Sequence, residues 1–421
     1  MTDTTRDAGP QEGATAPEQA DRGEAPSSTR RGPLTAAGSL AGTLLSELFG
    51  VLGRGLDRGI ERIEYWLVDA RHARYGLAIT RILLGLTGLG LLITNFRTRY
   101  YAFGSGSAWN GEAAQPVSDF PQIWIFSLFH RLALHDGWFT LACLVLGALA
   151  VLVILGWRTK IVLPIFFVGW VSFIEVNDAL GDQGDNMYRI TLLALLFADT
   201  AGRWSLDARR RGRGQALRGP WWKRAWHGGE FAPAWLTNTL HNLALVAVAT
   251  HVCFVYASGA LYKAGGAAWQ HGYAIYNPLQ TQRFGPWPEL SDLFTTWGPM
   301  VAVISWTSII LQMSFPMMLM RRPTRIIALF GICGFHIGIA VLMGLPWFSL
   351  AMIAIDAIFV RDVTWARLAG RIGDGWRQAR AGDRGDPDGD DTPERGATPA
   401  TEESEQAREV AAPDEAPEPA R

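Results

Sequence analysis

The stretch LHNLALVAVATHVCFVYASGALYK, Leu240–Lys263, decides the fold. It is apolar for more than twenty residues and ends on a lysine, and about 20 apolar residues are enough for a helix to cross a bilayer. The 421-residue chain is 49% hydrophobic, has 18 tryptophans and contains several more stretches of this kind. We therefore expect an all-α, multi-pass protein of the cell membrane, folded as a transmembrane helical bundle.

Eight apolar segments are expected to cross the membrane. They are 76–94, 138–156, 160–177, 187–201, 240–262, 298–320, 325–345 and 347–360, of which the fourth and the eighth are short. Basic residues occupy every second connection, for example Arg158 with Lys160, the arginines of 209–213, and Arg321 with Arg322. Because basic residues favour the cytoplasmic side, this alternation predicts eight crossings with both termini cytoplasmic.

The two ends of the chain differ in composition from its middle. Residues 1–35 are rich in Ala, Pro, Gly and polar residues, and 366–421 begin with a short basic segment and become acidic. Such sequences cannot bury a core, so we expect disordered tails. Residues 36–70 repeat apolar side chains every three or four positions with arginines between them, which predicts an amphipathic helix in the cytoplasmic interface. Residues 71–365 form the transmembrane domain.

The three cysteines, Cys143, Cys253 and Cys333, each lie in an apolar stretch. This placement gives neither a disulfide framework nor the spacing of zinc ligands, and small buried hydrophobic residues are the simplest interpretation. No metal site is predicted from them. Membrane lipid, and not nucleic acid, is the partner expected for such a chain.

Several ionisable residues fall within the expected spans, where they are costly and usually face the interior of a bundle. Arg81 and Asp356 lie at comparable depth, and burying either alone is unfavourable, so we predict a structural ion pair between them. Arg189 lies close in depth to Glu175 and to an acidic loop. Ion pairing is the simplest interpretation there as well.

His251 and His336 lie near the middle of two different spans. Two histidines at this depth could hold a haem or a metal. The commoner outcome is a neutral imidazole that hydrogen-bonds a neighbouring hydroxyl or carbonyl group. Sequence alone leaves open whether either of them binds anything.

Lys263, at the end of the quoted stretch, has two possible roles. A cation at the C-terminus of a helix meets the negative end of the helix dipole, and its long side chain can reach the headgroups. Basic residues are scarce on this predicted outer side, however, and a desolvated lysine can lose its proton and act as a base. The sequence alone does not show whether Lys263 caps its helix or acts as a base.

The residues after Lys263 favour a pocket. Two glycines would allow a ligand to approach closely, and Trp269, His271 and Tyr273 could wall a flat apolar site at headgroup depth. A lipid quinone carries its ring at this depth. We expect Lys263 to point into this pocket, with His336 or the acidic loop of Asp182 and Asp185 on its far wall.

Three stretches carry a resemblance to a known family. They are SGALYKAGGAAWQHGYAIYN at 258–277, GDNMYRITLLALLFADTAGRWSLD at 184–207 and FHIGIAVLMGLPWFSLAMIAIDAIF at 335–359. Together they resemble the vitamin K-dependent gamma-carboxylase-like membrane proteins, the HTTM family. The similarity covers about residues 70–365.

The resemblance implies a helical bundle and, for true carboxylases, a lysine that deprotonates vitamin K hydroquinone during glutamate carboxylation. Lys263 falls at or beside that lysine. Two features differ: Gly184, Asp185 and Asn186 stand where the carboxylases have a histidine, and the large extramembrane domain that binds their substrate is missing. The chain therefore looks closer to small bacterial members, including those of the sporulation-delaying toxin system, which mature or export a secreted antimicrobial peptide.

Three hypotheses about function follow. The first is a peptide-modifying enzyme that uses a lipid quinone as its cofactor. The second is a non-catalytic membrane partner that escorts a small secreted peptide or serves its export machinery. The third is a structural bundle without enzymatic activity. The sequence names neither the substrate nor the oligomeric state.

Overall fold

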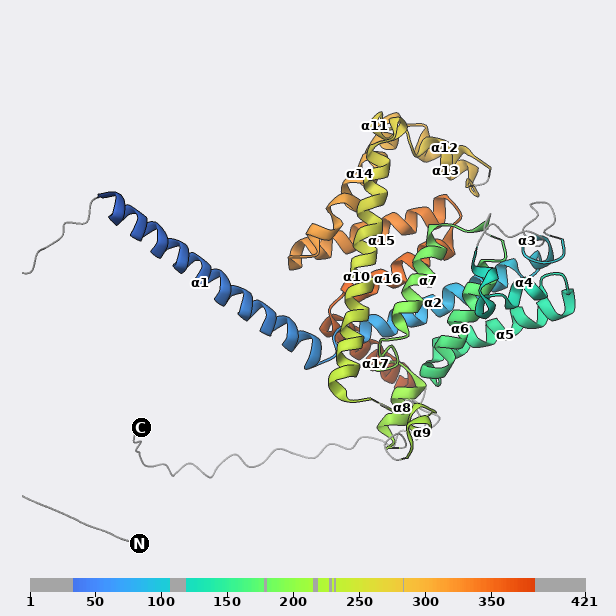
Figure 1. Ribbon diagram of the computed structural model, residues 1–421. Coiled ribbons are helices and arrows are strands. Elements are labelled where there is room, and N and C mark those ends of the chain that lie inside the picture. Colours follow the sequence, from blue (N-terminus) through green and yellow to red (C-terminus); the bar gives the residue numbers. More distant parts are fainter. Residues whose placement is uncertain are drawn as a thin grey trace, which may run out of the picture. The chain divides into compact units, whose positions relative to one another are not determined.

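The computed structural model describes residues 33–106, 119–177, 180–214, 219–226, 229–230, 232–282 and 284–382. Within these ranges all regular structure is helical, as the sequence predicts (Figure 1). The predicted disordered tails lie almost wholly outside the described residues. The chain divides into two units, Met1–Asp362 and Val363–Arg421.

Five helices of the described chain are both long and apolar enough to cross a membrane. They are α2 (Arg74–Asn95), α5 (Asp136–Leu155), α10 (Ala234–Ala264), α14 (Gly298–Met318) and α15 (Arg322–Leu342). Shorter apolar helices are α6 (Thr159–Ile174) and α16 (Pro346–Asp356), which continues as η5 (Ala357–Phe359). The fourth expected segment corresponds to α7 (Gln183–Leu195), which ends earlier than the hydropathy indicated. These helices make the chain a multi-pass membrane protein with five candidate spans.

Short helices connect these elements. They are α3 (Arg99–Ala102), η2 (Phe120–Gln122), η3 (Trp124–Phe126), α4 (Leu128–Leu132), α8 (Leu206–Gly212), α9 (Trp221–Trp226), α11 (Ala267–Gln270), α12 (Tyr276–Gln280) and α13 (Pro288–Thr295).

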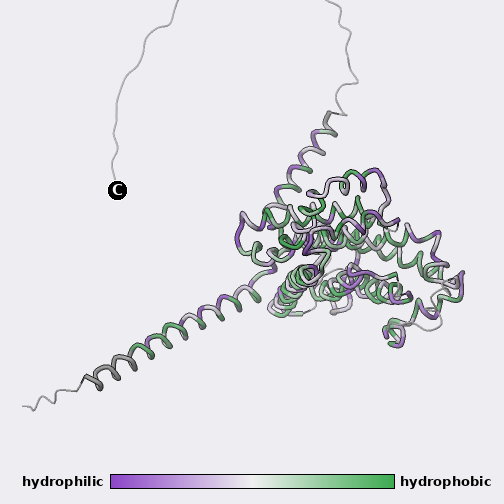
Figure 2. Tube along the Cα trace, turned by 90° about the horizontal axis from the view of Figure 1, so that it is seen from above, coloured by the Kyte–Doolittle hydropathy of each residue, from purple (hydrophilic) through white to green (hydrophobic). Residues whose placement is uncertain are grey.

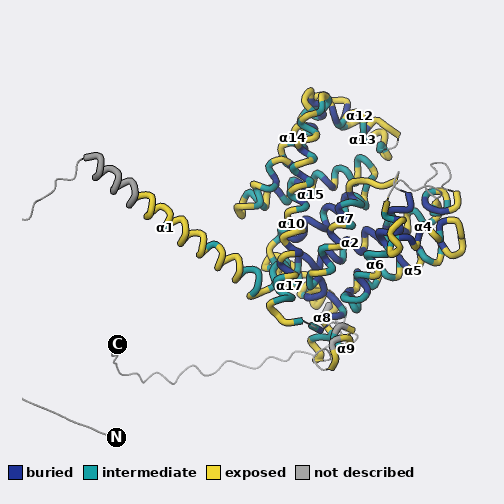
Figure 3. The backbone as a smooth tube through the Cα atoms, viewed as in Figure 1, coloured by how far each residue is buried: buried dark blue, intermediate teal, exposed yellow. Residues whose placement is uncertain are grey.

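Helix α2 is the most deeply buried span. Two thirds of its apolar window (67%) is buried inside the protein, compared with 17% for α15. It packs against α5, α16 and α7, and Figure 3 shows buried residues concentrated along it. Gly88 of α2 permits a close approach, because a Cβ there would lie 2.8 Å from the Tyr188 hydroxyl. That hydroxyl donates to the Leu84 carbonyl at 2.5 Å, which joins α7 to α2.

Helix α10 packs against α14, α7 and α1, while α15 packs against α14 and α16. With 31 residues α10 is about 46 Å long at 1.5 Å per residue, which exceeds a hydrocarbon core of roughly 30 Å. Both of its ends therefore reach polar surroundings. Two polar sites are built there, one at each end.

Hydrophobic residues predominate along the helices of the bundle (Figure 2). Large side chains such as Leu144, Phe254, Ile310 and Phe330 are exposed on four different helices. A protein surrounded by water would bury such a surface, whereas lipid solvates it. The exposure thus agrees with the assignment of these helices to a membrane.

Helix α1 (Pro33–Val68) covers the region in which the sequence predicts an amphipathic helix. Its apolar side chains, among them Leu48, Leu52 and Leu56, are exposed. Its C-terminal end contacts the bundle, where the Trp66 ring stacks on His72 with centroids 4.6 Å apart. Its location in the membrane interface remains a prediction.

In the second unit, helix α17 (Asp362–Gly382) contains the basic segment predicted to begin near residue 366. The side chains along it are mostly exposed, including Trp376. One ion pair, Arg377 to Asp374 at 2.5 Å, joins neighbouring turns.

Candidate functional site

Lys263 lies in the last turn of α10 and points toward α14. Its Nζ donates to the Gln312 Oε1 atom at 2.5 Å, and it lies 5.2 Å from the ring centroid of Trp269 and 5.3 Å from that of Phe335. Among the described residues Nζ forms no ion pair and no hydrogen bond to the last carbonyl groups of α10. A neutral amide and two aromatic faces therefore surround this cation, and the side chain does not cap its helix.

Of the predicted pocket residues, Trp269 is the one brought to Lys263. The Trp306 indole fixes Trp269 by donating to its backbone carbonyl at 3.1 Å. His271 and Tyr273 lie on an exposed turn, with ring centroids 6.3 Å apart, and His271 Nδ1 is 2.7 Å from the Ala267 carbonyl. Among the described residues, no hydrogen bond or cation–ring contact joins either of those two residues to the lysine.

Asp182 and Asp185 form a capping box at the start of α7. Asp182 Oδ1 accepts from the backbone N–H groups of Gly184 and Asp185, and Asp185 Oδ2 accepts from that of Asp182 at 3.1 Å. With Glu175 and Arg189, which form an ion pair, they line a cavity of about 280 Å³. No hydrogen bond or ion pair of the described residues joins either aspartate to Lys263.

The pKa of Asp185 is raised from 3.8 to about 6. Burial is the main cause, and the neighbouring carboxylates of Asp182 and Glu175 act in the same direction. The hydrogen bond from the Asp182 backbone and the charge of Arg189 oppose the rise.

A buried chain of three polar groups joins α10, α15 and α16. The Tyr256 hydroxyl lies 2.7 Å from Asp356 Oδ2 and 3.1 Å from His336 Nε2. Exposed fractions are 2% for Tyr256, 1% for His336 and 6% for Asp356. Because the hydroxyl has one proton, either the imidazole donates to tyrosine and tyrosine to the carboxylate, or a protonated Asp356 donates to tyrosine and tyrosine to His336. His336 Nδ1 and Asp356 Oδ1 are buried and have no hydrogen-bond partner among the residues that the structure describes.

This polar chain lies beside the Lys263 site. Tyr256 precedes Lys263 by seven residues, so both lie on one face of α10 about 10 Å apart along its axis. Phe335 contacts the lysine, and its ring also contacts the ring of the next residue, His336, with centroids 5.1 Å apart. The far side of His336 is covered by Phe348, with ring centroids 5.8 Å apart.

The predicted ion pair between Arg81 and Asp356 is not formed. Asp356 is bound to Tyr256, whereas Arg81 Nη2 donates to the Trp204 carbonyl at 2.8 Å and to the Ile154 carbonyl at 3.4 Å. The guanidinium lies against Gly156, which ends α5 in a left-handed conformation (φ 62°). The Ile154 carbonyl at the negative end of α5 and the Trp204 carbonyl in the connection before α8 therefore stabilise this buried charge in place of a carboxylate.

His251 and His336 lie on α10 and α15 without a shared ligand set. His251 Nε2 is buried, and no group in the described part of the chain forms a hydrogen bond with it. In the parts of the chain that the structure describes, no three His, Cys, Asp or Glu side chains come together as a metal ion would require.

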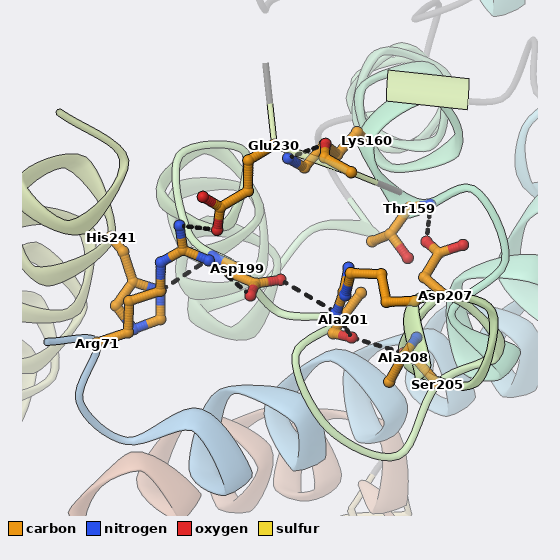
Figure 4. A network of polar contacts seen from close by, with 12 residues as sticks. Arg71, Thr159, Lys160, Asp199, Ala201, Ser205, Asp207, Ala208, Glu230 and His241 are labelled. Atoms are coloured by element: carbon orange, nitrogen blue, oxygen red, sulfur yellow. Dashed lines mark hydrogen bonds and ion pairs between the residues drawn. The ribbon is translucent and has the colours of Figure 1, made fainter. Parts of the chain in front are cut away.

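At the other end of α10, Asp199 is the centre of a charged network (Figure 4). Its carboxylate accepts from Arg71 at 2.9 Å and lies 3.9 Å from Arg211, while its backbone N–H donates to His241 Nδ1 at 3.0 Å. Arg71 also pairs with Glu230 at 2.5 Å. Burial raises the pKa of Asp199, but Arg211, Arg71, His241 and Lys160 together hold it below its usual value.

Two residues that follow Asp199 in the sequence, Ser205 and Asp207, extend this network. The Ser205 hydroxyl accepts from the Ala208 backbone at 2.8 Å and so caps α8. Asp207, 1% exposed, accepts from the backbone N–H groups of Arg158 at 2.9 Å and Thr159 at 2.7 Å, and it pairs with Arg210. The carboxylate thus binds the N-terminus of α6. Asp199, Ser205 and Asp207 all belong to the DTAGRWSLD segment and hold this end of the bundle together.

A comparison with protein families identifies the domain. The model of the HTTM domain matches residues 72–365, well over half of the chain. The chain belongs to the HTTM family. The matched range contains Lys263, the buried Tyr256 chain and Asp199. No curated protein and no solved structure is significantly similar to the chain.

Sequence analysis of this HTTM protein missed three site residues, Tyr256, Gln312 and Phe335. The sequence could have indicated Tyr256, because a residue seven positions before Lys263 lies on the same face of the helix. The indication for Gln312 is weaker: it is a lone amide side chain within the apolar helix α14. Neither signal says which groups on the neighbouring helices complete the site.

Proposed function

We propose that this HTTM protein modifies a small secreted peptide and that Lys263 is the base that couples this reaction to a lipid quinol. The observation that supports the proposal is the environment of the lysine: Nζ is held by the neutral Gln312 amide and lies between two aromatic rings, without a carboxylate partner. A carboxylate would hold the amine in its charged form, in which it has no lone pair with which to take a proton.

The residues present suit a flat, hydrophobic ring with polar substituents. Trp269 and Phe335 would contact the faces of the ring, and Lys263 with Gln312 would meet its polar substituent. When bound, a quinol supplies an acidic hydroxyl group and the electrons for the oxygen-dependent carboxylation implied by the resemblance, in which dioxygen and carbon dioxide are co-substrates.

The protein's own part is to take and hold a proton at Lys263 Nζ. The ammonium group formed in this way is stabilised by the hydrogen bond to Gln312 Oε1 and by the two aromatic rings, which attract a cation. These interactions strengthen as charge develops on the lysine, which is the property that a general base requires.

In this proposal the reaction takes place on the outer side of the membrane. Eight crossings with both termini cytoplasmic agree with the alternation of basic connections, provided that α6, α7 and α16 complete the set begun by the five longer spans. Lys263 then faces the compartment into which a peptide is secreted. Reporter fusions in the 209–213 connection and after Lys263 should lie on opposite sides.

The experiment uses the purified full-length protein in lipid vesicles with reduced menaquinone, dioxygen, carbon dioxide and a glutamate-containing test peptide. Mass spectrometry follows the oxidised quinone product and the peptide mass. We expect Lys263→Ala and Lys263→Arg to fold but to lose at least about 100-fold in quinol oxidation. Full activity in both variants would refute the proposal. A wild-type protein that binds the peptide without changing its mass would favour the escort function instead.

A further inference from the structure

Helix α17 carries an exposed apolar stripe. Leu368, Ile372 and Trp376 follow one another at intervals of four residues, which places them on one face of the helix. They are 43%, 62% and 64% exposed. The helix is 21 residues long, but its other faces are too polar for it to count among the candidate spans. Nothing in the proposed reaction uses this stripe.

Basic side chains border the stripe. Arg371 directly precedes Ile372 and Arg377 directly follows Trp376, so the two arginines lie about 100° to either side of it. The charged residues of the helix are four arginines, all of them exposed, and two aspartates: Arg367, Arg371, Arg377 and Arg380 against Asp362 and Asp374. Four positive and two negative groups leave a surplus of two positive charges. An apolar stripe between basic side chains is complementary to a layer of anionic lipid headgroups above acyl chains.

The first residue of α17 is fixed at the end of a membrane span. Asp362, which is also the last residue of the first unit, accepts through its carboxylate from the backbone N–H groups of Arg74 at 2.9 Å and Tyr75 at 3.0 Å. These are the first two residues of α2. With 22 residues α2 is about 33 Å long, enough to reach from one headgroup layer to the other. The chain therefore enters α17 at the depth of the headgroups.

The sequence of α17 is poorly suited to a helix that water surrounds on all sides. Gly370, Gly373 and Gly375 lie in its interior, and a Cβ at any of the three would meet nothing within 4 Å, so close packing does not explain them. Glycine is unfavourable in a helix interior, and most helices owe their stability to the packing of an amphipathic face. A surface that covers the stripe would supply this stabilisation.

We infer that α17 binds the surface of a membrane that contains anionic phospholipids, on the side where α2 begins. The stripe enters the upper part of the acyl layer, and the arginines bind lipid phosphate groups. A coiled-coil partner fits less well, because its seam needs intervals that alternate between three and four residues. This inference does not depend on the proposed function at Lys263.

Hydrogen exchange followed by mass spectrometry tests this binding on the full-length protein in lipid nanodiscs. One set of nanodiscs contains phosphatidylglycerol, and the other contains phosphatidylcholine alone. We expect the backbone amides of residues 363–382 to exchange at least about 10-fold more slowly with phosphatidylglycerol, because each basic residue near an anionic surface adds to the binding. The difference should shrink as salt is added. Equal exchange in the two lipids would overturn the inference.

Two serine variants test the stripe. Ile372→Ser removes its central side chain. Val363→Ser is the matched control, because Val363 is an apolar residue of the same helix, 52% exposed, that lies nine positions before Ile372 and thus on the opposite face. In phosphatidylglycerol nanodiscs, Ile372→Ser should speed the exchange of residues 363–382 by about threefold or more, and Val363→Ser should leave it unchanged. Equal effects of the two variants would contradict the inference.

A shortened chain tests the other candidate to cover the arginines. Residues 383–421 are rich in Asp and Glu, and a protein that ends at residue 382 lacks them. With phosphatidylglycerol, α17 of the shortened protein should exchange as slowly as that of the full chain, or more slowly. Loss of protection on shortening would show that the acidic segment covers the helix, and the inference would be wrong.

Discussion

Charged side chains at the two ends of α10 have different kinds of partner. At its start, Arg71, Asp199 and Glu230 are tied into ion pairs, and His241 contacts the same network. At its end, Lys263 has a neutral amide as its partner and no carboxylate. Paired charges fix a structure because breaking the pair leaves a buried charge uncompensated. A cation held by neutral groups can change its protonation state more readily. In the proposed function, this contrast distinguishes a structural end of α10, at Asp199, from a chemical end, at Lys263.

The largest effect is expected at the structural end, from Asp207→Ala. This change removes the acceptor for two backbone N–H groups of α6 and the partner of Arg210. Loss of a buried, multiply bonded carboxylate costs about 3–5 kcal/mol, so thermal unfolding should shift down by many degrees. Asp374→Ala is the control: it breaks an ion pair whose partners are 79% and 60% exposed and should cost no more than about 1 kcal/mol. Equal losses in the two variants would contradict the account.

A second variant at the same end tests how Arg81 is held. In Gly156→Ala, the added Cβ would lie 2.0 Å from Arg81 Nη1 and 2.4 Å from the Ser205 Cβ, at a position with φ of 62°. We expect a loss of roughly 2–4 kcal/mol from the displaced guanidinium and the strained backbone. Gly259→Ala, where a Cβ would meet nothing within 4 Å, should leave stability unchanged or slightly higher. Chemical denaturation of both variants provides the measurement.

Much of the bundle could be predicted from sequence, because long apolar runs dictate helices that lipid can solvate. The close approach of Glu175 to Arg189 was also predictable from their depth. Depth says nothing about which side of a helix a residue faces, however, and so the pairing of Arg81 with Asp356 was predicted wrongly. The true partners of Arg81 are backbone carbonyls, which every residue carries and which therefore leave no sequence signal.

The chemical end can be probed through the buried polar chain. Tyr256→Phe removes the hydroxyl that joins His336 to Asp356 and leaves both side chains without that partner. A loss of about 1–3 kcal/mol in unfolding free energy is expected. Tyr262→Phe, at an 86% exposed position on the same helix, should have no measurable effect. If Tyr256→Phe is as stable as the control, the hydrogen-bonded chain does not contribute to the fold.

The smallest effect concerns pH and Asp185. Since the folded protein raises the pKa of this carboxyl from 3.8 to about 6, it binds the proton more tightly than the unfolded chain does. The group favours folding most below pH 4 and loses that contribution as pH rises through 6. Asp185→Asn keeps an oxygen acceptor for the Asp182 backbone but cannot ionise, so between pH 4 and 7 it should lose up to about 2 kcal/mol less stability than the wild type. If the free energies of unfolding of the two proteins changed in the same way with pH, the raised pKa of Asp185 would be contradicted.

The central claim is that Lys263 works because its partner is neutral, and Gln312→Glu tests it most directly. The new carboxylate would lie where Gln312 Oε1 now accepts from Nζ, so it would form an ion pair and hold the lysine charged. Gln312→Met, which stays neutral, is the matched control. The account predicts that Gln312→Glu folds at least as stably as the wild type but loses at least about 10-fold in quinol oxidation, while Gln312→Met retains more activity than Gln312→Glu. A Gln312→Glu protein with full activity would contradict the claim.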